Sequence, residues 1–203
     1  MKQRCILQNG GVFLQSNRRQ SSTAILITLS VLSAIGILLG KFLAFNVTEF
    51  MRFSLENLSI IFAGIVFGPW CGFAVGAVQD LVGCLIVGYT INPIITLGSA
   101  LIGLVSGTVF AISKRLAPII RVTISTLVAH LLGSVIIKSA GLAIFYSLPF
   151  GITLAWRTLN YLIVGAVEII LLIILLKSKP LLSQINKIKH FSLFEKGDGH
   201  NDV

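Results

Sequence analysis

The amino-acid sequence predicts an all-α membrane protein, a six-transmembrane-helix bundle with both its N and C termini in the cytoplasm. Of its 203 residues, 55% are hydrophobic and only 11% are charged, and the mean hydropathy is +0.95. Soluble domains carry about 25% charged residues, so a chain with so few must turn most of its surface toward lipid. The apolar residues also fall into separate segments, and the basic residues lie mainly at the ends of these segments.

Six apolar segments divide residues 23–176, which we expect to form one transmembrane domain. They cover about Thr23 to Phe45, Leu58 to Phe67, Trp70 to Val87, Ile94 to Ile112, Pro118 to Ile137 and Pro149 to Leu176. The first has the roughly 20 residues that a helix needs to cross a bilayer. The second is short, because ten helical residues rise only about 15 Å, half of the hydrocarbon core. We expect it either to be tilted and shielded by protein or to continue into a structured outer loop.

Turn residues separate these segments. The second stops at Gly68-Pro69, and the loop from Gly88 to Pro93 separates the third from the fourth. The fifth and sixth begin at Pro118 and Pro149.

The distribution of Lys and Arg predicts the orientation, because short cytoplasmic loops carry an excess of them. With six spans, one side collects twelve basic residues and the other keeps only Lys41, Arg52, Lys138 and Arg157. The richer side is therefore predicted to be cytoplasmic. Residues 1–22 are then a basic cytoplasmic tail without the apolar core of a secretory signal. Residues 177–203 are predicted to be a polar cytoplasmic tail.

Ionisable residues at membrane depth are the first candidates for function, since they are costly there and usually face the bundle interior. At about 1.5 Å per helical residue, Asp80, His130 and Arg157 all lie near the middle of the membrane and could share one layer. One interpretation is a structural Asp80–Arg157 ion pair with His130 hydrogen-bonded nearby. The other is that Arg157 meets an anionic ligand group and Asp80 orients it.

The sixth segment carries a polar stripe that must face other helices. Its members recur at helical spacing: Arg157, Asn160, Tyr161, Val164 and Glu168. Glu168 lies deeper toward the cytoplasm and is predicted to be a structural partner rather than a ligand contact.

The outer loops supply further candidate ligand groups. The first holds Glu49, Arg52, Ser54, Glu56 and Asn57, and the second holds Tyr89, Thr90, Asn92 and Pro93. The second loop suits a lid over a planar ligand, although a plain connecting loop is an equal alternative.

Several classes of function are excluded or disfavoured by what the sequence lacks. There is no Gly-rich phosphate-binding loop with its Lys, no HExxH motif and no convincing Ser-His pair, so the chain is not predicted to be an enzyme. The three cysteines lack metal-ligand spacing, and neither a metal nor a cofactor is predicted. Because the basic residues lie at the ends of apolar segments, the net charge of +9 does not indicate nucleic-acid binding.

One long run resembles a known family. Residues Phe62 to Gly83 contain an Ala-Gly, a Phe-Gly-Pro turn, a Gly-rich helix and Asp80-Leu-Val-Gly. Residues Thr96 to Gly107 and Arg157 add to the likeness. The chain resembles the S components, the substrate-binding subunits of energy-coupling factor (ECF) vitamin transporters, over about residues 23–176, and is most similar to the folate-type group.

The resemblance implies a six-helix bundle in the cell membrane that captures a vitamin from outside, with folate as the first candidate. It would then join a transmembrane coupling subunit and two ATPases. The family's Ala-x-x-x-Ala docking motif corresponds here to Ala24 and Thr28, or to Ser30 and Ala34. The expected ligand-binding residues are Arg157, Asp80, His130, Asn160, Tyr161, Tyr89, Asn92 and Arg52.

Three alternatives stand beside folate binding. The loop from Gly88 to Pro93 departs from the folate-type pattern, so the ligand could be another vitamin or small molecule. A small structural membrane scaffold has a similar size and span count. A self-sufficient secondary transporter is disfavoured, because no internal repeat is evident and many such transporters are built from repeats.

Overall fold

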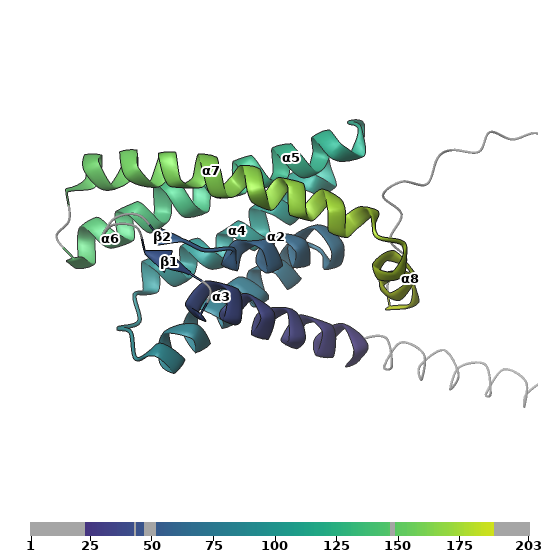
Figure 1. Cartoon of the computed structure of the whole chain (residues 1–203), viewed down its shortest axis with the longest axis horizontal. Coiled ribbons are helices and arrows are strands. Elements are labelled where there is room, and N and C mark those ends of the chain that lie inside the picture. Colours follow the sequence, from purple (N-terminus) through teal and green to yellow (C-terminus); the bar gives the residue numbers. More distant parts are fainter. Residues whose placement is uncertain (1–22, 43, 47–51, 147–148, 189–203) are drawn as a thin grey trace, which may run out of the picture.

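The structure is a computed structural model that describes residues 23–42, 44–46, 52–146 and 149–188. Within these residues the chain forms a bundle of helices with one pair of two-residue strands (Figure 1). Five helices are long and apolar enough to cross a membrane: Thr23–Phe42, Pro69–Val87, Pro93–Ile112, Pro118–Phe145 and Phe150–Lys177. A shorter apolar helix covers Glu56–Phe67. The prediction of a helical membrane bundle is confirmed at this level.

The first spanning helix ends in a π-helical turn, η1 (Leu38–Phe42). Strand β1 (Phe45–Asn46) then pairs with β2 (Arg52–Phe53) in antiparallel register. Helix α2 (Glu56–Phe67) follows and stops at Gly68, whose φ of 107° lies in the region that favours glycine. Pro69 begins α3 (Pro69–Val87), because a helix needs no N–H donor at its first position.

The second half of the bundle begins with a well-capped helix. Helix α3 ends at Gly88 in the left-handed conformation, and Asn92 Oδ1 accepts hydrogen bonds from the first backbone N–H groups of α4 (Pro93–Ile112). The next long helix consists of α5 (Pro118–Ala129), the π-helical η2 (His130–Ile137) and α6 (Lys138–Tyr146). Helices α7 (Phe150–Lys177) and α8 (Lys179–Ile188) complete the described chain.

The short helix α2 is the centre of the core. Ten of its twelve residues are buried, and Ile60, Ile61 and Val66 are almost completely shielded by the surrounding helices. The longer helices, by contrast, leave many large apolar side chains exposed, as lipid-facing surfaces do. Protein shielding is therefore why a 12-residue helix of about 18 Å is stable in this bundle.

Glycines allow α2, α3 and α4 to approach closely. A Cβ added at Gly72 would lie 2.6 Å from the carbonyl oxygen of Gly103, and one at Gly107 would lie 2.6 Å from that of Gly64. Both distances are shorter than a normal van der Waals contact. These glycines on α2, α3 and α4 therefore serve direct backbone contact between the helices.

Two boundaries differ from prediction. The fifth spanning helix does not end at Ile137 but continues through α6, so Lys138, expected in an outer loop, is a helical residue only 3% exposed. The segment expected as a polar tail includes α8, whose Ile185 is 4% exposed and belongs to the core. Lys138 is buried together with its ion-pair partner Glu56, and α8 buries Ile185 against the core, so helix continues past both predicted boundaries.

Candidate functional site

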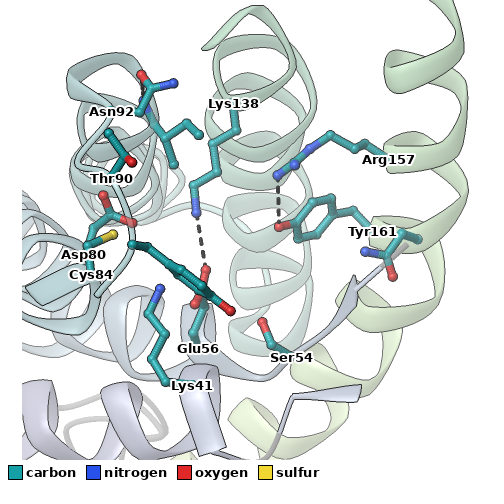
Figure 2. Close-up of a pocket in the computed structure, with 13 residues that line it drawn as sticks. Lys41, Ser54, Glu56, Asp80, Cys84, Thr90, Asn92, Lys138, Arg157 and Tyr161 are labelled. Carbon is teal, nitrogen blue, oxygen red and sulfur yellow. Dashed lines mark hydrogen bonds and ion pairs between the residues drawn. The ribbon is translucent and has the colours of Figure 1, made fainter. Parts of the chain in front are cut away.

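A cavity of about 200 Å³ opens between the helices. Its lining combines three cationic side chains, two carboxylates and two tyrosines with smaller polar groups. The lining residues are Lys41, Ser54, Glu56, Asp80, Cys84, Tyr89, Thr90, Asn92, Ile95, Lys138, Arg157, Asn160 and Tyr161. They come from η1, the segment before α2, the loop between α3 and α4, and helices α2, α3, α4, α6 and α7, so the cavity exists only in the folded bundle (Figure 2).

An ion pair crosses the cavity. Lys138 Nζ lies 3.4 Å from Glu56 Oε1, and the side chains are 4% and 25% exposed, respectively. Figure 2 shows the lysine reaching the glutamate from the opposite side of the cavity, with Lys41 beside that glutamate. The Lys41 ammonium also lies 5.9 Å from the centroid of the Tyr89 ring, within cation–π range.

Arg157 is held on the α7 side of the cavity. Its Nε donates a hydrogen bond of 3.0 Å to the backbone oxygen of Ser134, a residue of the π-helical η2. One Nη donates at 3.4 Å to the Tyr161 hydroxyl one helical turn away. These bonds fix the guanidinium while leaving further N–H donors for a partner, because arginine has five.

Asp80 is positioned by α4 rather than by Arg157. Its carboxylate accepts a 2.6 Å hydrogen bond from Thr96 Oγ1, and among the ion pairs of the described residues none joins it to Arg157. The structural Asp80–Arg157 pair expected as one interpretation is therefore not formed. Asn92 caps α4 and also donates from Nδ2 to the Gly141 oxygen at 3.1 Å, which ties the loop before α4 to α6.

A second buried pair lies behind the cavity. His130 Nε2 and Glu168 Oε2 are 2.6 Å apart, and the two side chains are 3% and 0% exposed. The imidazole stacks on the Tyr161 ring at 5.1 Å and lies 3.2 Å from the Ser134 hydroxyl. The pair thus supports the wall that holds Tyr161, and Glu168, expected to be a structural partner rather than a ligand contact, pairs with His130.

Six of the eight residues predicted to bind a ligand line this cavity: Arg157, Asp80, Asn160, Tyr161, Tyr89 and Asn92. His130 does not line it and lies behind Tyr161. Arg52 lies in β2, and its side chain is outside the described part of the chain.

The remaining lining residues divide into those that the sequence had suggested and those that it had not. Ser54, Glu56 and Thr90 were candidates from the outer loops, whereas Lys41, Cys84, Ile95 and Lys138 were not predicted. The two lysines carried a usable signal: each lies at the outer end of an apolar segment, on the side where basic residues are scarce.

The residues expected to dock a partner lie on the first spanning helix. Ala24 and Thr28 are half-buried, whereas Ser30 and Ala34 are exposed. Ser30 and Ala34 also border a shallow groove of about 350 Å³ lined mainly by apolar residues of this helix and α3. No group of three or more potential metal ligands occurs among the described residues.

Comparison with known proteins identifies the family. Residues 20–179 match the family model described as ECF-type riboflavin transporter, S component. A crystal structure of FolT bound with folic acid has a TM-score of 0.61 and 25% identity, covering 73% of this chain and 89% of that one. The S component of a bacterial ECF transporter has a TM-score of 0.59 and 22% identity, covering 83% and 99%. No curated protein matches the sequence.

Proposed function

The chain belongs to the family of ECF-type riboflavin transporter S components, and from this premise we propose that its cavity captures a vitamin from outside the cell. Membership makes the protein an integral membrane component of a transporter rather than an enzyme, and it implies a vitamin ligand and ECF partner modules. The single observation that carries the site is the cavity in which three cationic side chains converge beside two tyrosines.

The proposed topology has six passes with both termini in the cytoplasm. Helix α2 begins at the cavity with Glu56, while Pro69 at the start of α3 packs against Gly107 near the far end of α4. This supports counting α2 as a pass in addition to the five long helices, which makes six. Residues that include β2 would complete the crossing at its outer end. In Figure 1 the first spanning helix begins, and α8 lies, at the same end of the bundle, as an even number of passes requires. The excess of Lys and Arg on that side supports a cytoplasmic location.

Folate is the first candidate ligand. The cavity holds Lys41, Lys138 and Arg157 against Glu56 and Asp80, so its formal charge is positive by one. Among the ion pairs of the described residues, neither Lys41 nor Arg157 takes part. A ligand with a carboxylate and a planar ring would satisfy such cations and stack on Tyr89 or Tyr161. The similarity to FolT bound with folic acid supports this choice.

Riboflavin is the second candidate, because the matching family is described by that vitamin. Its planar ring would use the tyrosines, while its uncharged chain would bond to the smaller polar groups and leave the cations without a ligand anion. The cavity volume of about 200 Å³ is below the roughly 300–1,000 Å³ of pockets that enclose drug-sized ligands. Either vitamin would therefore have to widen the cavity or extend out of it.

The partners would be a transmembrane coupling subunit and two ATPases. The exposed Ser30 and Ala34 on the first spanning helix support the second of the two docking alternatives, because the apolar groove beside them leaves room for another helix. Ala24 and Thr28 are less accessible.

The function is tested by ligand binding to the full chain purified in detergent. Isothermal titration with folate, riboflavin and thiamin should give saturable binding of one vitamin and none of thiamin, a cation that the positive cavity disfavours. Saturable binding of thiamin alone, or of no vitamin, would refute the proposed site. Co-purification with coupling and ATPase subunits tests the partners separately.

A further inference from the structure

The ion pair across the cavity gives the site a resident anion. Lys138 is nearly inaccessible, and the carboxylate 3.4 Å from its ammonium belongs to Glu56, a residue 82 positions earlier in the chain. Glu56 is also the first residue of α2, where the helix dipole favours a negative charge. Lys138 and the N-terminus of α2 therefore stabilise its carboxylate, while a quarter of the side chain stays exposed.

The Glu56 side chain packs against Gly40 of the first spanning helix. A Cβ added at Gly40 would meet the Glu56 side chain closely, so only glycine leaves the room that it needs. The neighbouring Lys41 lies beside Glu56, and the stem of Lys41 packs on Gly83, where an added Cβ would lie 2.7 Å from Lys41 Cε. Glu56 therefore lies among the same cations that an anionic ligand would use.

A ligand carboxylate approaching Lys138 meets a carboxylate already there. It must either displace Glu56 from the lysine or bind beside it, and both cost electrostatic free energy in a partly desolvated cavity. An uncharged ligand bears neither cost and can leave the pair intact.

We propose that Glu56 is a specificity-determining residue that lowers the affinity of the cavity for anionic ligands relative to uncharged ligands of similar shape. This rests on the proposed vitamin-binding function. The cationic side chains attract a ligand anion, and Glu56 opposes them, so the ratio of the two affinities depends on its charge.

The test measures the dissociation constants of folate and riboflavin for the wild type and for Glu56→Gln, which removes the charge and keeps the size. The folate affinity should rise about tenfold, while the riboflavin affinity changes less than about twofold. Where wild-type binding of one vitamin is too weak to titrate, competition against the other supplies its value. Equal changes for both vitamins, or no change in their ratio, would overturn the inference.

Two further variants test whether the change in the affinity ratio comes from the charge of Glu56 itself. Glu56→Asp keeps the charge and should keep the wild-type ratio, whereas a ratio like that of Glu56→Gln would overturn the role of charge. Arg115→Gln removes an exposed charge from the α4–α5 loop, outside the cavity lining, and should leave the ratio unchanged; a shift of comparable size would mean that net charge rather than Glu56 sets the ratio and would overturn the inference. If neither wild type nor variants bind any vitamin, the proposed function fails; wild-type binding with an insensitive ratio defeats only the role of Glu56.

Discussion

The contact between α3 and α4 predicts a large effect from a single methyl group at Gly103. A Cβ added there would meet the Gly72 carbonyl group closer than any normal contact and would lie 2.8 Å from its Cα. Restoring a distance of 3.4 Å to that Cα alone requires the helices to separate locally by about 0.6 Å. The obstacle is backbone, so no side-chain rotation relieves it.

Overpacking of this kind costs about 1–3 kcal/mol. For a chain of this size, each kcal/mol shifts the unfolding midpoint by about 2–4 °C, so Gly103→Ala should lower it by about 2–12 °C. The same two helices carry the Asp80–Thr96 hydrogen bond at the cavity, so vitamin affinity should fall as well. Thermal unfolding in detergent, followed by tryptophan fluorescence, measures the first effect, and titration measures the second.

The matched control is Gly151→Ala. Gly151 lies in the first turn of α7 with nothing within 4 Å of an added Cβ, so its unfolding midpoint should be unchanged or slightly raised. Equal midpoints for Gly103→Ala and the wild type would refute the claim that backbone contact between α3 and α4 stabilises the bundle.

Three further predictions concern the polar groups. Arg157→Ala should weaken binding of an anionic vitamin at least about tenfold, measured by titration, because the guanidinium borders the cavity without a described carboxylate partner. Glu168→Leu should lower stability by about 1–3 kcal/mol, measured by denaturant unfolding, because it leaves the buried His130 imidazole without its 2.6 Å partner. Thr96→Val should lower it by about 1–3 kcal/mol, since it leaves the Asp80 carboxylate without that hydrogen bond.

Each of these has its own control. Arg115→Ala removes an exposed guanidinium from the α4–α5 loop and should not alter binding; an equal loss there would mean that Arg157 acts only through net charge. Replacing both His130 and Glu168 with leucine should recover much of the lost stability, and failure to do so would argue against a cost of leaving the imidazole without its partner. Thr158→Val removes an exposed hydroxyl bonded only within its own helix, so a loss equal to that of Thr96→Val would contradict a special role for the latter.

The sequence by itself determined the fold class and several of the polar residues that line the site. Apolar segments long enough for a bilayer gave five spanning helices to within a few residues in most places, and the cost of burying charge singled out Asp80 and Arg157. The helical repeat placed Asn160 and Tyr161 with Arg157, because period alone decides which residues share a face. These features follow from local properties of the chain, so no contacts had to be known.

Only the tertiary structure decided which charges are partners. Asp80 bonds to Thr96 and not to Arg157, and Lys138 pairs with Glu56 from a different helix, because helix packing brings distant residues together at distances that spacing cannot give. Lys138 was expected in a loop because a charge usually ends an apolar segment. Its pairing with a carboxylate lets the helix continue through this charge. Packing of the surrounding helices on α2, in turn, makes this short helix a stable centre of the bundle.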